Sequence, residues 1–173
     1  MPKMIISDGI INPNAKQSGP TIESVKLTFS SYKKESVESA YLFVLNLESP
    51  IYNVIGFRFR RINYTYAKNT VIHVAYLQFT NLPLGNASKT MNDESYMAAL
   101  PIQDGTGTIL GSYAFQSDYT VMLKNEIGKI NRLNIAVVKE DSTNDGFFIP
   151  FADLSYLHVE VDVLYLDHRI KEH

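Results

Sequence analysis

The chain has 173 residues, of which 45% are hydrophobic and 20% are charged, and this composition is typical of one globular domain. A domain of this length buries roughly two thirds of its unfolded surface, so it needs no disulfide or metal to fold. The formal net charge is −2, and the absence of cysteine excludes a thiol nucleophile, a thiolate metal site and a disulfide framework.

Residues 1–20 lack the alternation of apolar and polar side chains that marks a strand, and they are rich in Gly, Pro, Asn, Ser and Lys. The apolar patch from Met4 to Ile6 is too short for a signal peptide, and no later run is long enough to span a membrane. We therefore expect an extended N-terminal arm that becomes ordered against a partner, on a soluble protein made and assembled in the cytosol or nucleus.

Residues 21–167 alternate with the period of two that is typical of strands. In the first run, Val25, Leu27 and Phe29 share one face, and no stretch has a helical period. The predicted strands are ESVKLTFSSY, AYLFVLNLES, NVIGFRFRRINY, TVIHVAYLQFTN, ESYMAALPI, GTILGSYAF, DYTVMLKN, INRLNIAVVKE and LSYLHVEVDVLYL. Residues 168–173 are predicted to be a loose C-terminal tail.

Turn-forming residues separate these runs, at Pro50, at 81–86, at 104–105, at 126–128 and at 144–146. Short strands with regular turns predict an all-β sandwich or barrel of about eight to nine antiparallel strands. The pattern alone leaves the order of the strands open, because different sandwiches share the same alternation.

Charge is distributed unevenly along the chain. Residues 49–92 contain no acidic residue and carry a charge of +5, from Arg58, Arg60, Arg61, Lys68 and Lys89, which leaves −7 on the rest. Such a separation of charge can attract a nucleic acid, or it can support a head-to-tail contact between copies of the chain.

The arginine-rich run is the strongest candidate for an interaction surface. Alternation places Arg58 and Arg60 on one face, and Tyr64 and Tyr66 extend that region with rings that can stack on bases or on partner side chains. In an acidic chain, three arginines are weak support for direct nucleic-acid binding. Arg and Tyr are also enriched in protein interfaces, so we predict a subunit interface at Arg58, Arg60, Arg61, Tyr64 and Tyr66, with a solvated face as the open alternative.

Two loops resemble ligand-binding motifs only in part. Asp141, Thr143 and Asp145, followed by Gly146, match the opening of a calcium loop, but Ala152 stands where the loop needs a bidentate Glu. The glycine-rich stretch DGTGTILG lacks the spacing of a phosphate-binding loop and opens a strand instead of a helix. We expect both to be turns.

One further row of side chains could hold a metal. His158, Glu160 and Asp162 share a face of the last strand, but a metal site would need ligands from other strands as well. No motif places a histidine beside a nucleophile. We therefore predict a solvated or interfacial face, no cofactor and no enzymatic activity.

Several segments resemble the single jelly-roll penton and minor capsid proteins of tailless icosahedral double-stranded DNA viruses, a group that includes virophages, Polinton-like viruses and large nucleocytoplasmic DNA viruses. The segments that carry the resemblance are ESVKLTFSSYKK, AYLFVLNLESPIYNVIGFRFRRINYTYAKN, VAYLQFTNLPLGNASKT and INRLNIAVVKEDSTNDGFFIPF. The resemblance covers about residues 21 to 166 and consists of strand patterns without an invariant functional residue.

This resemblance implies a single jelly roll in a virion capsid, assembled in the host cytoplasm or nucleus. It implies a penton that forms a homopentamer at each vertex and contacts the major capsid protein and other minor capsid proteins. A ring of this kind uses a heterologous interface, in which Arg58, Arg60 and Arg61 would face a neighbouring copy or the major capsid protein. The N-terminal arm would run under the shell.

Three alternatives stay open. A cement protein between capsomers fits the same resemblance. A carbohydrate-binding module shares the sandwich architecture, although such modules are usually secreted and often contain Trp, which this chain lacks. A cupin-type metalloenzyme would need convergent histidines, and His73 and His158 form no such cluster in the sequence.

Overall fold

The prediction of an all-β domain is confirmed. The computed structural model describes residues 6–7, 10–11, 20–33, 38–67, 74–83, 88–89, 95–102, 107–114, 119–140 and 148–168, in which one 3-10 turn, η1 (Ser31–Lys33), accompanies the strands. The strands are β1 (Ile6–Ser7), β2 (Ile10–Ile11), β3 (Thr21–Ser30), β4 (Leu42–Ala67), β5 (Val74–Phe79), β6 (Ser88–Lys89), β7 (Ser95–Tyr96), β8 (Ala98–Pro101), β9 (Thr108–Ala114), β10 (Thr120–Glu140), β11 (Phe148–Pro150) and β12 (Leu154–Asp167).

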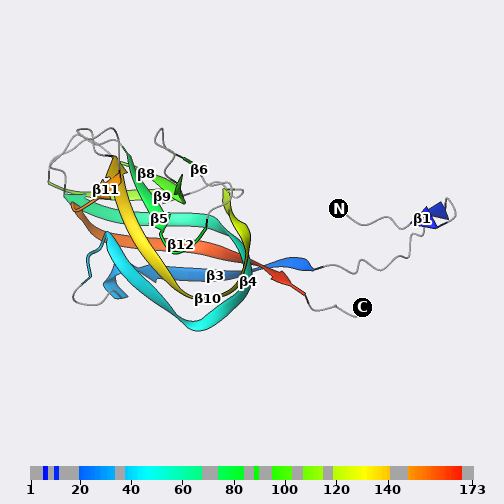
Figure 1. The fold of residues 1–173 in the computed structure, drawn as a ribbon. Helices are drawn as coiled ribbons and strands as arrows, with labels where there is room; N and C mark the ends of the chain where they lie inside the picture. Colours follow the sequence, from blue (N-terminus) through cyan, green and yellow to red (C-terminus); the bar gives the residue numbers. More distant parts are fainter. Residues whose placement is uncertain are drawn as a thin grey trace.

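Eight of these strands form one antiparallel sheet that curls over on itself (Figure 1). The main path through the sheet is β3-β12-β4-β10-β5-β8, with β9 on β4 and β11 on β10. The long strand β4 pairs with β10 along its first half and with β12 and β9 along its second half. It therefore joins two parts of the sheet, which we call the β3 layer (β3, β12, second half of β4, β9) and the β5 layer (first half of β4, β10, β5, β8).

The strand pairs are nested along the chain. The first long strand pairs with the last, β3 with β12, and the first half of β4 pairs with β10. Inside these pairs, the second half of β4 pairs with β9, and β5 pairs with β8. Two further pairings, β12 with β4 and β10 with β5, complete the layers. The chain thus has the pairing of an antiparallel ribbon that has been rolled up.

Two of the predicted turns lie inside strands, and the main sheet has eight strands, in agreement with the predicted eight to nine. The runs before and after Pro50 form the single strand β4, and the runs before and after residues 126–128 form β10. The register between β4 and β10 shifts at both places. A proline is tolerated at such an irregularity because no ladder hydrogen bond is needed there. Close by, Asn53 adopts a positive φ of 54°, a conformation that Asn accepts more readily than most residues.

Aromatic rings from the two layers meet in the core. Phe29 of β3 and Phe57 of β4 lie on the β3 layer, and Phe79 of β5 lies on the β5 layer. The Phe79 ring centroid is 6.3 Å from that of Phe29 and 5.2 Å from that of Phe57. All three side chains are buried, so the apolar face of each layer is covered by the other.

Much of the two predicted ends lies outside the described residues. Within the predicted arm, β1 and β2 form a small antiparallel pair, with Ile6 opposite Ile11. Of the predicted tail, only His168 is described, and the calcium-like stretch from Asp141 to Phe148 is described only at Phe148. The glycine-rich stretch is described from Gly107, and its residues enter β9, as expected for a turn that opens a strand.

Candidate subunit interface

A β-bulge at Arg60 determines which residues of the arginine-rich run face outward. Arg61 lies opposite Glu160 on β12, whereas Phe59 lies opposite Val161, so Arg60 is the extra residue on β4. The bulge shifts the alternation by one position. Phe57 and Phe59 point into the core before it, and Ile62, Tyr64 and Tyr66 point into the core after it.

Tyr64 and Tyr66 are therefore core residues, which does not fit their predicted place at a contact between subunits. Their exposed fractions are 2% and 1%, and their rings stack with centroids 6.0 Å apart. The Tyr64 hydroxyl donates a hydrogen bond to the carbonyl oxygen of Pro101. Burial, and to a smaller extent the neighbouring Tyr66, raises the pKa of Tyr64 to about 12. A partner subunit could not reach either ring without opening the fold.

Arg60 is held by a carboxylate of its own chain. Its Nε donates to Oδ2 of Asp162 at 2.8 Å, and its Nη2 contacts the same oxygen. Asp162 is only 8% exposed, and a buried carboxylate needs such a partner because the charge has lost its hydration. The Arg60 side chain is 43% exposed. Its main role is thus inside the domain, where it neutralises Asp162.

Arg58 and Arg61 are placed differently. Arg58 is half-buried on β4, opposite Asp162 on one side and Thr120 of β10 on the other. Arg61 is exposed, and its charge contributes to lowering the pKa of Glu160. Within the described part of the chain, neither arginine forms an ion pair. These two guanidinium groups are therefore the arginines best placed to meet a partner.

The predicted row on β12 is an ion-pair ladder on the outer face of the β3 layer. Lys26 Nζ lies 3.1 Å from Glu160 Oε2, and His158 Nε2 lies 3.8 Å from Glu160 Oε1. The hydrogen bond from Lys26 is the largest cause that lowers the pKa of Glu160. Among the described residues, no group of three or more His, Cys, Asp or Glu side chains could hold a metal ion.

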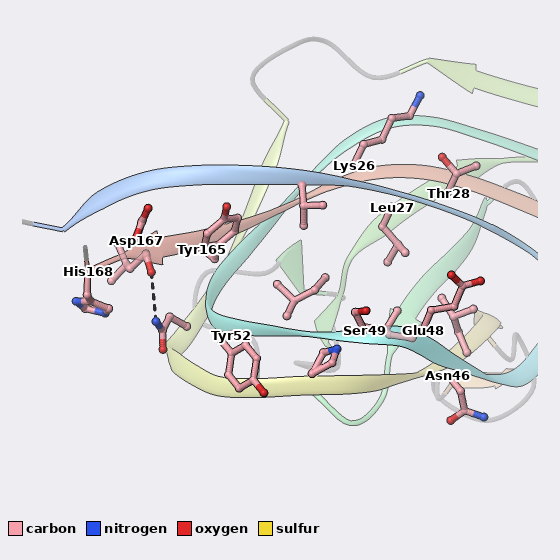
Figure 2. A pocket seen from close by; sticks show the side chains of 17 residues that line it. Lys26, Leu27, Thr28, Asn46, Glu48, Ser49, Tyr52, Tyr165, Asp167 and His168 are labelled. Carbon is pink, nitrogen blue, oxygen red and sulfur yellow. Dashed lines mark hydrogen bonds between the residues drawn. The ribbon is translucent and has the colours of Figure 1, made fainter. Parts of the chain in front are cut away.

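A groove with a volume of about 1010 Å³ opens along one edge of the molecule, between β3, the first half of β4 and the end of β12 (Figure 2). Leu27 points into the groove, whereas Lys26 points away from it. Half-buried leucines of β4, Leu45 and Leu47, line the opposite side. The groove leaves no signal in the sequence, because its walls come from three separated segments that meet only in the folded sheet.

A second cluster lies on the outer face of the β5 layer. The ring centroid of Tyr76 is 4.6 Å from that of Tyr96 and 5.0 Å from that of Phe148. The Tyr76 hydroxyl is 3.1 Å from Glu140 Oε1, and burial followed by the charge of Glu140 raises the pKa of Tyr76 to about 12. All three rings are half-buried, so each presents part of its surface to solvent.

Comparisons with known proteins do not identify a family. No protein-family model matches the chain, and a search of curated proteins finds no significant match. In the described residues there is no helix with the length and apolar character needed to cross a membrane.

Proposed function

We propose that this protein is a structural capsid protein, a single jelly roll that forms a pentamer at icosahedral vertices and contacts the major capsid protein. The observation that carries the proposal is the nested pairing of the strands. Pairing of β3 with β12, of β4 with β10 and β9, and of β5 with β8 is what results when an antiparallel ribbon is wrapped into two facing sheets. A jelly roll is built in this way, and viral capsid proteins are among the proteins that use it.

The distribution of charge supports assembly into a ring. Each copy in a ring presents one surface to its first neighbour and a different surface to its second. The second half of β4 carries Arg58 and Arg61, whose charges are not neutralised by ion pairs within the described residues. Because residues outside 49–92 sum to −7, a neighbouring copy can supply the opposite charge. We therefore assign the intersubunit role to Arg58 and Arg61, with Arg60 serving the fold.

In this proposal the protein resides in the virion and assembles in the host cytoplasm or nucleus. The N-terminal arm ties the pentamer to the surrounding shell, including the major capsid protein and other minor capsid proteins. A cement protein that lies between capsomers would use the same fold without forming the five-copy ring, so the oligomeric state separates the two roles.

The native mass of the purified protein tests this proposal. Light scattering at low and high salt is expected to give a pentamer that dissociates as salt rises, because exposed charge pairs are screened. The double variant Arg58→Gln, Arg61→Gln should lower the mass at low salt, whereas Arg132→Gln, which changes an exposed arginine on β10, should not. A monomer at both salt concentrations would contradict the penton role and favour a cement protein or a binding module.

The aromatic cluster on the β5 layer supports a second candidate function, carbohydrate binding. Sugar rings stack on aromatic side chains, and Tyr76, Tyr96 and Phe148 lie together with the Glu140 carboxylate at the cluster's edge. A glycan array with the wild-type chain and the Tyr96→Ala variant would test this function. Binding that is lost in the variant would favour it over the capsid role, and the absence of binding would remove it.

A further inference from the structure

The β3 layer has two open edges. Among the described residues, β3 pairs only with β12, and β9 pairs only with β4. The strand order β3-β12-β4-β9 puts these two strands on opposite sides of the layer. Each therefore presents one row of backbone N–H and C=O groups to which another strand can bind.

The β9 edge lacks the features that usually protect an exposed strand. Its sequence, TILGSYA, has no charged residue and no proline, which are the side chains that most often prevent edge strands from pairing. Leu110 is 72% exposed, and Tyr113 is also exposed. An uncharged edge strand with exposed apolar side chains is expected to be covered in the working state of the protein.

The β3 edge also has exposed apolar side chains, together with the charged Glu23 and Lys26, and it borders the groove. Ile22 is 63% exposed, and Val25 is exposed at the mouth of the groove. Behind Val25, Leu27, Leu45 and Leu47 are only half-buried, so the core is not closed on this side. A strand added to the free side of β3 would cover these residues.

The two edges match each other face by face. Leu110 lies opposite Thr65, which faces outward, so Leu110 is on the outer face. Ile22 is four positions before Lys26 on β3, so it shares the outer face with Lys26. Tyr113 lies opposite the buried Ile62, as Val25 lies opposite the buried Val163. Each edge thus offers one exposed apolar side chain on the outer face and one on the inner face.

The charges beside the two edges are also complementary. Arg61 pairs with Ala114 at the end of β9, so a guanidinium group lies next to that edge. The groove beside β3 is lined by the exposed carboxylate of Glu48. Its basic residues already have partners, since Lys26 pairs with Glu160 and His168 Nε2 lies 3.4 Å from Glu126.

We propose that β9 of one copy adds as a strand to the open edge of β3 in the next copy, so that Leu110 and Tyr113 cover Ile22, Val25 and the groove. This inference rests on the proposed self-association and specifies the surfaces that carry it. Because the contact joins two different edges, it is heterologous and can close into a ring. Strand addition supplies the backbone hydrogen bonds, and the apolar side chains supply the fit.

Two single variants and their mixture test the contact. Leu110→Glu damages only the β9 edge, and Val25→Glu damages only the β3 edge. Light scattering should show that each variant is monomeric at a concentration at which the wild type is an oligomer. An equimolar mixture should form a dimer and nothing larger, because each such pair retains a single intact β9–β3 contact. Tyr32→Glu changes another highly exposed apolar residue outside both edges and should keep the wild-type mass.

The outcomes separate this inference from the proposed function. A wild-type pentamer whose mass is unchanged by Leu110→Glu and Val25→Glu would overturn the contact and leave the capsid role standing. Variants that are monomeric alone and do not combine when mixed would also overturn it. A wild-type chain that is monomeric at every concentration would overturn both. If circular dichroism shows that Val25→Glu fails to fold, Ile22→Glu replaces it, because Ile22 faces solvent.

Discussion

Arg60 and Asp162 join β4 to β12 across the bulge, with Arg60 Nε donating to Asp162 Oδ2 at 2.8 Å. The bulge gives the guanidinium group its place over the carboxylate, and it also turns the following tyrosines into the core. One local irregularity therefore determines both the ion pair and the residues that the surface presents.

We predict that Arg60→Met destabilises the domain by about 2 kcal/mol, because it leaves the buried Asp162 carboxylate without its cation. This value is below that for a fully buried pair because the Arg60 side chain is 43% exposed. Arg61→Met, at the next position, should change the free energy of unfolding by no more than about 0.5 kcal/mol. Urea unfolding of both variants checks the prediction, and equal effects would contradict it.

A second prediction concerns the contact between Gly111 and Tyr64. A Cβ atom at position 111 would clash with the Tyr64 ring, which is packed in the core and hydrogen-bonded to Pro101. Gly111→Ala should therefore cost about 1–3 kcal/mol through overpacking. Gly128→Ala is the matched control, because a Cβ atom there meets nothing within 4 Å. Thermal unfolding should show a lower midpoint for the first variant alone.

The corner of β4 at Asn53 gives a third prediction. Its φ of 54° is strained for most residues, and its Nδ2 donates to the carbonyl oxygen of Leu166 at 3.3 Å. Asn53→Gly and Asn53→Ala both remove the hydrogen bond, but only the alanine retains the strain. The alanine variant should be less stable than the glycine variant by about 1 kcal/mol. Denaturant unfolding that ranks them in the opposite order would show that this corner is not strained.

A fourth prediction follows from the tyrosines whose pKa is raised. Tyr64 and Tyr76 have a pKa of about 12 in the folded chain, against an ordinary value of 10.0. Between pH 10 and pH 12 the unfolded chain loses protons that the folded chain retains, so the stability contributed by these two tyrosines should be constant below about pH 10 and fall as pH rises further. Denaturant unfolding from pH 8 to 12 measures this decline. The Tyr64→Phe, Tyr76→Phe variant should show a smaller decline, and an identical one would contradict the assignment.

The alternation of side chains determined the class of this protein, because burial of one face of a strand is a property of neighbouring residues. It correctly predicted an all-β chain and the location of most strands. It also placed His158, Glu160 and Asp162 on one face of the last strand, but Asp162 is buried against Arg60 instead of facing solvent. It also predicted that the glycine-rich stretch is a turn that opens a strand. These features require no knowledge of which strands are partners.

Only the tertiary structure decided which faces, edges and grooves the protein presents. If the alternation of side chains were unbroken at Arg60, Tyr64 and Tyr66 would share a face with the arginines. The bulge places them in the core instead. Pro50 predicts a turn in the sequence, but in the structure β4 continues past Pro50 and pairs with β10 on both sides of it, with a shift in register. The physical reason is that register and strand edges depend on partners more than 50 positions away, such as residue 160 opposite residue 61. Such pairings leave no mark on the local sequence.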